Sequence, residues 1–186
     1  ELSQGMSVQV SGQISIYEGR GDLQLIIYRV NPIGEGALQL KFEQIKELIP
    51  HREPFLYLDS LFDIVKLKKA SGLKTFNKDE DFFKGHFPGN PVVPGVILIE
   101  MMAQTAAALI AYSLKSETFD KIVYLMNVES SKFRNPVFPG MKVKANVESL
   151  RSRGRVWKFY GKMYDDKFNL LCESIWSAMI MDKKNV

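Results

Sequence analysis

Alternating apolar and polar residues near the start of the chain predict two strands. The segment SVQVSGQISIYE, residues 7–18, alternates and is bounded by glycines, GRGD is a turn, and LQLIIYRV, residues 23–30, is a second strand. The spacing changes in ALQLKFEQIKELI, residues 37–49, where the apolar positions recur at helical intervals until Pro50. We therefore expect a hairpin followed by a helix.

The rest of the chain combines one long apolar segment with several alternating ones. VILIEMMAQTAAALIAYSL, residues 96–114, is apolar nearly all round, which predicts a helix enclosed by protein. KDEDFFKG, residues 78–85, suits a short turn or helix. In the last alternating segment Leu171 and Ile175 share a face with Glu173, so the alternation is imperfect. Strands are expected over residues 55–69, 70–77, 121–133, 141–151, 155–166 and 168–182. These elements predict an α+β fold, in which a curved antiparallel sheet wraps a long central helix.

The apolar segment is long enough to cross a membrane, but other features argue against a span. Glu100 and Gln104 lie in its middle, where a carboxylate is costly in lipid, and its flanks are loop and strand. The amino end, ELSQGMSVQV, lacks the basic start and apolar middle of a signal peptide. We expect no membrane span and a cytoplasmic protein. Because the sequence begins with Glu instead of Met, we expect it to be a piece of a longer chain.

Composition narrows the class of protein. A length of 186 residues with 46% hydrophobic content suits one domain, or one domain with an appendage. The single cysteine, Cys172, excludes an internal disulfide and suits a reducing compartment. With only two histidines beside it, a zinc site is not expected, and no carboxylate cluster with metal-binding spacing occurs. We expect neither metal nor cofactor.

The net charge of +4 is unevenly distributed. Residues 1–46 contain four Lys/Arg against five Asp/Glu, which leaves 21 against 16 for residues 47–186. The basic excess is densest in LRSRGRVWK, residues 150–158. This segment is either a solvated hairpin or a docking patch for an acidic partner.

Candidate chemistry is concentrated in HFPGNPVVPGVILIE, residues 86–100. Pro94 and Gly95 suit the first turn of a helix, where backbone N–H groups lack internal partners and lie at the positive end of the dipole. Gly95 has no side chain, so a ligand oxygen could approach its N–H closely. We expect an oxyanion site there.

Two side chains in this segment suit acid–base catalysis. Desolvation by apolar neighbours is expected to raise the pKa of Glu100 and keep it neutral, while Gln104, one turn on, could hydrogen-bond the carboxyl. His86 lies on a loop stiffened by prolines and could remove a proton. Together they suit abstraction of a proton α to a carbonyl and loss of a β-hydroxyl. Taken singly, a loop histidine can be structural, and Glu100 could pair with a core Lys or Arg.

Three segments carry a family resemblance: LIPHREPFLYLD (48–59), GHFPGNPVVPGVILIEMMAQ (85–104) and KFRNPVFPG (132–140). They resemble signature segments of the bacterial 3-hydroxyacyl-[acyl-carrier-protein] dehydratases of fatty acid synthesis, over roughly residues 44–182. The resemblance implies the hot-dog fold, a dimer and often three dimers together.

The resemblance also implies residue roles. His86 matches the catalytic histidine and Glu100 the catalytic carboxylate, which face each other across the dimer interface in that family. Gly95 matches the backbone donor to the thioester carbonyl. Substrate-binding or supporting roles fall to these residues: Phe87 in the acyl tunnel, Val96, Gln104 steadying the acid and Tyr124 near the tunnel mouth. A related branch that also isomerises has Asp at the position of Glu100, so the branch that only dehydrates is implied.

The implied substrate is a (3R)-3-hydroxyacyl chain on acyl carrier protein, and the implied product is the trans-2-enoyl thioester. Because the carrier protein is acidic, the basic excess gains a partner. No cofactor is implied beyond the phosphopantetheine that carries the substrate. The candidate contacts to the carrier protein are Lys132, Arg134, Arg151, Arg153 and Arg155.

The front segment does not fit that family. GQISIYEGRGDLQLIIYRVNPIGEGALQLKFEQIKE resembles part of the exodeoxyribonuclease VII large subunit, at the end of its oligonucleotide-binding barrel. We expect an appendage over residues 1–46, from a fusion or junction, and a dehydratase domain over 47–186. The alternatives are another acyl-thioester enzyme of the hot-dog fold, such as a thioesterase, and a single-stranded nucleic acid-binding module. The slightly acidic front segment suits phosphate poorly, so no nucleic acid partner is expected.

Overall fold

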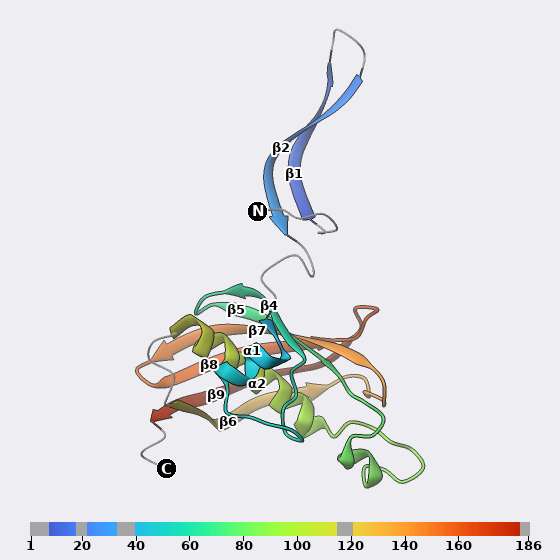
Figure 1. Ribbon diagram of the computed structural model, residues 1–186, viewed down its shortest axis with the longest axis vertical. Coiled ribbons are helices and arrows are strands. Elements are labelled where there is room, and N and C mark those ends of the chain that lie inside the picture. Colours follow the sequence, from blue (N-terminus) through green and yellow to red (C-terminus); the bar gives the residue numbers. More distant parts are fainter. Residues whose placement is uncertain (1–7, 18–21, 33–39, 115–120, 183–186) are drawn as a thin grey trace. The chain divides into compact units, whose positions relative to one another are not determined.

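The computed structural model describes residues 8–17, 22–32, 40–114 and 121–182. Contacts within the chain divide it into two compact units, residues 1–39 and residues 40–186. The first unit contains a hairpin, in which β1 (Val8–Tyr17) pairs antiparallel with β2 (Asp22–Pro32) (Figure 1). The predicted two-stranded appendage is therefore confirmed.

The second unit is built on a seven-stranded antiparallel sheet with the order β3-β4-β5-β7-β8-β9-β6. Its long strands correspond to the alternating segments of the sequence, and β6 lies at one edge. The strand bounds are β3 (Leu40–Lys41), β4 (Ser60–Val65), β5 (Lys69–Thr75), β6 (Lys121–Phe133), β7 (Lys142–Arg153), β8 (Val156–Tyr164) and β9 (Leu170–Asp182).

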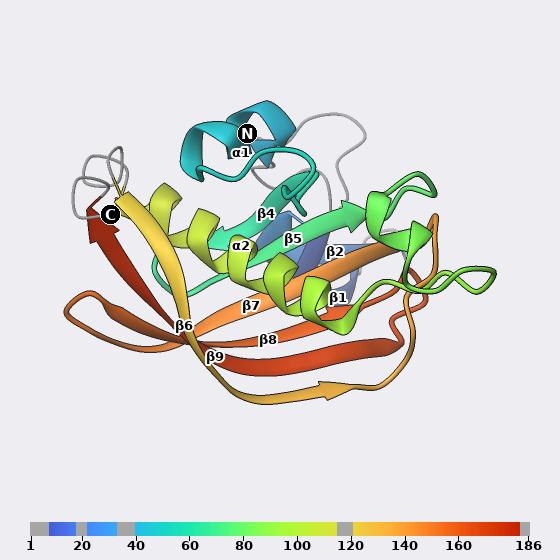
Figure 2. The ribbon, with the colours of Figure 1, turned by 90° about the horizontal axis from the view of Figure 1, so that it is seen from below.

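The long helix α2 (Gly95–Leu114) lies along the inner face of this sheet, which curves beneath it (Figure 2). It contacts β5, β7 and β8. A Cβ on Gly72 of β5 would lie 2.3 Å from Oγ1 of Thr105, so only glycine allows the helix to approach this closely. The helix is long and apolar enough to span a membrane, but about two-thirds of it is buried within the chain, as in a core helix. The predicted α+β architecture is confirmed.

The short helix α1 (Phe42–Leu48) belongs to the second unit and covers α2 from the side away from β8 and β9 (Figure 2). Its Ile45 side chain is completely buried in the core. The division between the units falls between residues 39 and 40, whereas the sequence placed it after residue 46. Because Ile45 packs in the core, residues 40–46 fold with the larger unit.

The expected strand over residues 55–69 is shorter in the structure. Only Ser60–Val65 form β4, and the residues before it are irregular. The backbone N–H of Tyr57 donates to the side chain of Gln104 instead of to a neighbouring strand. Side chains of α2 therefore hold this loop, an arrangement that alternation along the chain does not reveal.

Candidate active site

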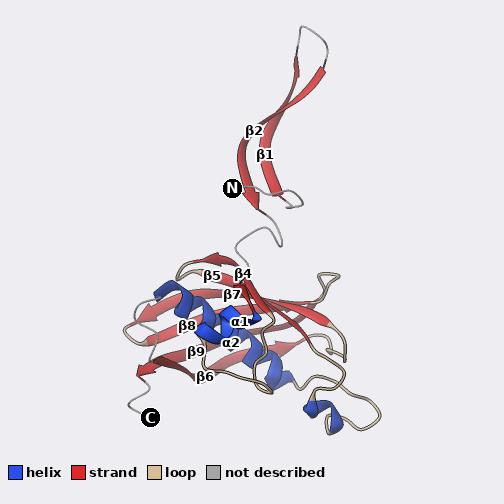
Figure 3. Ribbon diagram, in the orientation of Figure 1, coloured by secondary structure: helices blue, strands red, loops and turns tan. Residues whose placement is uncertain are grey.

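His86 lies on the loop between η2 (Asp81–Lys84), a single turn of 3₁₀-helix, and the start of α2. Figure 3 shows the loop that leads into α2 in tan. The loop is tied by its own backbone: the N–H of Val92 donates to the carbonyl of His86 over 2.9 Å. The His86 ring is tied as well, because Nδ1 lies 2.8 Å from the carbonyl oxygen of Val92. Since a carbonyl can only accept, the bond requires the proton on Nδ1 and leaves Nε2 with a lone pair. The ring is thus oriented as a base.

The first residue of α2 borders the same space as His86. A cavity of about 520 Å³ is lined by His86, Gly95, Val96, Phe133, Arg134 and further residues of the loop and of the chain after β6. A Cβ on Gly95 would lie 2.8 Å from the ring of Phe133, so glycine lets this aromatic side chain pack against the helix start. The cavity therefore combines a base with the unpaired amides at the positive end of a long helix.

Glu100 is held by two donors from different elements. Nε2 of Gln104, one turn along α2, donates to Oε1 of Glu100 over 2.9 Å, which is the hydrogen bond expected from the spacing. The same Nε2 also donates to the carbonyl of Phe55, while Oε1 of Gln104 accepts from the N–H of Tyr57. The second donor is Nε2 of His51, which lies 3.4 Å from Oε1 of Glu100. Gln104 thus orients the carboxylate, and the backbone of Phe55 and Tyr57 in turn fixes the Gln104 amide group.

The charge state of Glu100 differs from the prediction. Burial raises the pKa of its carboxyl, but the hydrogen bonds from His51 and Gln104, with the charge of His51, outweigh burial and lower the pKa below its ordinary value. The prediction that desolvation keeps this acid neutral is therefore wrong for the single chain. The sequence displays the apolar neighbours of Glu100 along the helix, whereas the His51 donor comes from a distant segment.

His86 and Glu100 have separate surroundings within the single chain. Among the described residues, the polar side chains bonded to Glu100 are His51 and Gln104, and the partner of the His86 ring is the Val92 carbonyl. Glu100 does not line the cavity around His86. One chain therefore presents a base without the acid beside it.

Three other predicted residues lie at exposed positions. The ring of Phe87 stacks on His86 with 4.0 Å between the centroids. Val96 lines the cavity around His86 and remains largely exposed. Tyr124 lies on β6 opposite Met179 of β9 and outside that cavity. The structure therefore brings Phe87 and Val96 to the site of His86, but not Tyr124.

The five basic candidates separate into two groups. Arg134 lines the cavity of His86 and contacts Glu173 at 2.5 Å, and Lys132, two residues earlier, lines a second cavity with Glu173. Arg151 and Arg153 instead line a cavity with Lys158, and Arg155 lies in the β7–β8 turn. Figure 2 shows this turn at the opposite end of the sheet from the loop after η2. Of the five, only Arg134 lines the cavity of the candidate base.

Neither a metal centre nor a thiol nucleophile is formed by the described residues. In residues 8–17, 22–32, 40–114 and 121–182, no three His, Cys, Asp or Glu side chains are grouped to hold a metal ion. Burial raises the pKa of the Cys172 thiol to about 11, so the thiolate is scarce at neutral pH. The available chemistry is that of the imidazoles and of Glu100.

Sequence reasoning missed His51, which it counted only against a zinc site. The residue lies in the quoted segment LIPHREPFLYLD, so its place in a signature segment was the available signal. Local spacing could not identify its partner, because Glu100 is distant along the chain.

Comparisons with known proteins identify the family of this chain. The FabA-like domain family matches residues 49–171. A 3-hydroxyacyl-[acyl-carrier-protein] dehydratase FabZ of Acidiphilium cryptum is 48% identical over 140 residues, which cover 75% of this chain and 84% of that protein. The FabZ of Rhodospirillum rubrum is 46% identical over 141 residues, covering 76% and 88%.

A solved structure supports the fold independently. The dehydratase heterocomplex ApeI:P from Xenorhabdus doucetiae contains a chain that superposes with a TM-score of 0.64 at 15% identity, covering 75% of this chain and 92% of that one. At this identity the likeness concerns the fold alone. Together with the sequence matches, it shows that this chain belongs to the FabA-like family of hot-dog proteins and, within it, to the FabZ-type 3-hydroxyacyl-[acyl-carrier-protein] dehydratases.

Proposed function

We propose that this protein dehydrates (3R)-3-hydroxyacyl chains on acyl carrier protein to trans-2-enoyl chains in fatty acid biosynthesis. The observation that carries this proposal is the cavity in which the free Nε2 of His86 and the first amides of α2 meet. The FabZ relatives support the same reaction. The enzyme is a hydro-lyase that needs no cofactor, because the thioester carbonyl itself provides the electron sink.

The reaction divides between two side chains. Nε2 of His86 removes a proton from C2, while the N–H of Gly95 hydrogen-bonds the thioester oxygen on which negative charge develops. Glu100 protonates the hydroxyl on C3, the C–O bond breaks and water leaves. Val96 lines the acyl site beside Phe87, whose ring stacks on His86, and Gln104 orients the acid. A glutamate at position 100 favours an enzyme that dehydrates without isomerising.

The acid that faces His86 comes from a second copy of the chain. Two observations support a homodimer: His86 has no carboxylate beside it among the described residues, and β6 is an edge strand with exposed apolar side chains. These side chains are Leu125, Met126 and Val128. An unpaired apolar edge favours pairing with another strand, and a twofold axis repeats each contact. Three such dimers assemble into the hexamer, in the cytoplasm.

Acyl carrier protein docks beside the His86 cavity, through the basic group that contains Lys132 and Arg134. The location of this group supports the assignment, because a substrate tethered to an acidic carrier must reach His86. The second basic group, in and around the β7–β8 turn, lies at the other end of the sheet (Figure 2). Residues 1–39 form an appendage outside this function.

An assay of crotonyl-thioester hydration tests the function. Loss of the enoyl absorbance in the presence of the protein, with formation of the (3R)-hydroxy product, is the expected result. Release of free thiol without hydration would instead indicate a thioesterase.

The shared site is tested by mixing His86→Ala with Glu100→Gln. Each variant alone should be inactive, whereas an equal mixture should regain up to about a quarter of the wild-type activity, because half of the dimers are mixed and each mixed dimer has one intact site of two. Absence of activity in verified mixed dimers would contradict a site built from two chains.

A further inference from the structure

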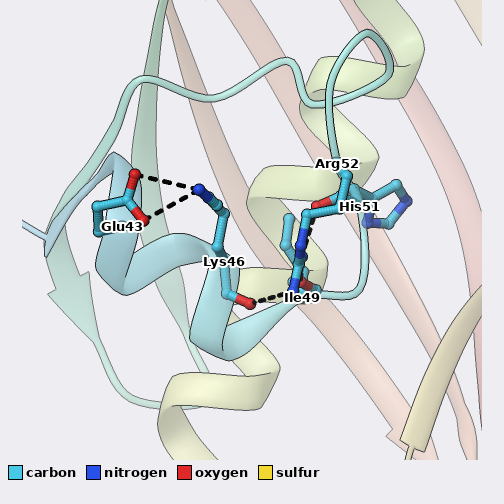
Figure 4. Close-up of polar contacts among 5 residues, drawn as sticks. All are labelled: Glu43, Lys46, Ile49, His51 and Arg52. Carbon is cyan, nitrogen blue, oxygen red and sulfur yellow. Dashed lines mark hydrogen bonds and ion pairs between the residues drawn. The ribbon is translucent and has the colours of Figure 1, made fainter.

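His51 is held in place at the end of α1 by its neighbour Arg52. The guanidinium of Arg52 donates to three carbonyl oxygens: those of Lys46 at 3.0 Å, Ile49 at 2.9 Å and His51 itself at 2.7 Å (Figure 4). These carbonyls close the last turn of the helix and the residues that follow it. Arg52 therefore fixes the backbone at His51 independently of the contacts that the His51 ring makes.

The ring of His51 has two nitrogens in contrasting positions. Nε2 lies 3.4 Å from Oε1 of Glu100, and both side chains are about four-fifths buried, with exposed fractions of 22% and 20%. Nδ1 is buried and makes no hydrogen bond to any described residue. Buried polar atoms nearly always have partners, so such an exception calls for a functional explanation.

The two donors to Glu100 differ in what they can give. The amide of Gln104 donates a hydrogen bond but never releases its proton, whereas a protonated imidazole can do both. Two donors stabilise the ionised carboxylate, and an ionised carboxylate cannot protonate a leaving hydroxyl. Among the described contacts of Glu100, His51 is therefore the one group able to supply the missing proton.

Other charged groups near this pair act on it from several elements. Lys121 of β6 lines a small pocket together with His51, and the Arg52 guanidinium contacts the His51 carbonyl. On the side of Glu100, burial and the charges of Glu80 and Glu100 raise the pKa of Tyr57, which therefore stays neutral. Two cations and the Glu100 carboxylate therefore lie near His51.

We propose that His51 is a positioning residue that shares one proton with Glu100 across the Nε2–Oε1 contact and returns it to Glu100 in each turnover. This inference rests on the proposed dehydration. The shared proton first moves from Nε2 of His51 to Oε1 of Glu100, and the O–H bond so formed then breaks as the hydroxyl leaves as water. Neutral His51 afterwards takes a new proton from solvent, which restores the single proton of the pair. The proton that His86 removed from C2 returns to solvent, so the protons balance.

The pH dependence of kcat for dehydration of a 3-hydroxybutyryl thioester tests this role in His51→Gln. Glutamine still donates a hydrogen bond to Glu100 but cannot release a proton. We expect kcat to fall about 10- to 100-fold near pH 8, KM to stay within about twofold and the alkaline limb to move to lower pH by about one unit or more.

Gln104→Leu is the matched control, because it removes the other donor to the same carboxylate. Here kcat also falls, but the alkaline limb moves to higher pH, since the ionised form of Glu100 loses support. A loss of activity in His51→Gln that is equal at every pH would overturn the proposal and leave His51 a packing role. Circular dichroism and the Tm show whether each variant folds. If His51→Gln does not fold, His51→Phe, which fills the same space but has no hydrogen-bond donor, takes its place.

Carbon-13 NMR of the Glu100 carboxyl separates this inference from the proposed function, because it needs no turnover. In the wild type we expect two steps in the carboxyl shift with pH, one from Glu100 itself and a smaller one where His51 loses its proton. The smaller step should vanish in His51→Phe. If it persists, the pair does not share a proton, even in an active enzyme. If the wild type hydrates no thioester but shows both steps, the proposed function fails and the coupled pair remains.

Discussion

The loop that carries His86 and the loop that carries His51 give the same side chain opposite electrostatic settings. The His86 ring donates to the neutral carbonyl of Val92, whereas the His51 ring faces the carboxylate of Glu100. A neutral acceptor fixes the tautomer and leaves the second nitrogen free to take a proton. A carboxylate in contact with a ring nitrogen can instead exchange a proton with it. The partner of an imidazole, more than its sequence motif, therefore decides whether it receives or supplies a proton.

Substitution of His86, the proposed base, is expected to cause the largest loss of activity. His86→Ala should lower kcat/KM for thioester hydration about 10³- to 10⁴-fold, because no other described group in the cavity can exchange the C2 proton. Steady-state kinetics over a range of pH measure it. A smaller loss than in His51→Gln would reverse the assignment of the two rings.

Gly95→Ala tests whether the base depends on the helix amide beside it. A Cβ at this position would lie 2.8 Å from the Phe133 ring, so the aromatic side chain must move and the carbonyl site is obstructed. We expect kcat to fall about 10²-fold, the size of a lost oxyanion donor. Gly85→Ala is the control, since nothing lies within 4 Å of a Cβ there. Equal activity of the two variants would contradict an oxyanion site at Gly95.

Gln104→Leu tests how strongly the loop clamp contributes to stability. It should lower the free energy of unfolding by about 2 to 3 kcal/mol, because Phe55 and Tyr57 lose buried backbone partners. Urea unfolding measures the change. Thr105→Ser, which keeps a buried hydroxyl on the next residue, provides a conservative comparison.

The same variant has a predicted pH signature. The lowered pKa of Glu100 means that its contribution to stability is present above the ordinary carboxyl value and is lost as the pH falls through the folded value. Without Gln104 the folded pKa rises toward the unfolded value, so the contribution should be smaller and its loss should be complete at a higher pH. An unchanged acid limb of the stability curve would show that Gln104 does not hold the charge.

A smaller effect is expected for the basic groups at the two ends of the sheet. Arg134→Gln should raise KM for an acyl carrier protein substrate about threefold to tenfold at low salt and leave KM for a small thioester unchanged. Arg151→Gln, in the other group, should change neither. A larger effect of Arg151→Gln would move the docking surface to the β7–β8 turn.

The smallest effect is expected from removing residues 1–39. The residues that hold both histidines lie in the unit of residues 40–186, so kcat and KM should stay within about twofold. The thioester assay and the Tm measure this. A large loss of activity would show that the hairpin takes part in the function.

Some parts of the fold were accessible from the sequence because their signals are local. α2 was predicted almost to the residue, since a segment that is apolar all round needs enclosure. The sequence did not show which face of β9 points into the core, because Leu171 and Ile175 share their face with the charged Glu173. In the structure, the buried residues include Ser174, Trp176 and Ala178 of the other face. Both faces carry apolar residues, so alternation alone could not select the inner one.

The sequence by itself determined the elements of the hot-dog fold and the grouping of His86, Gly95 and Glu100 within fifteen residues. Only the tertiary structure decided the ionisation of Glu100 and the role of His51. The physical reason is that helix and strand patterns depend on neighbours along the chain. The free energy of a charge depends on donors within a few ångströms in space, here brought by a loop from another part of the chain.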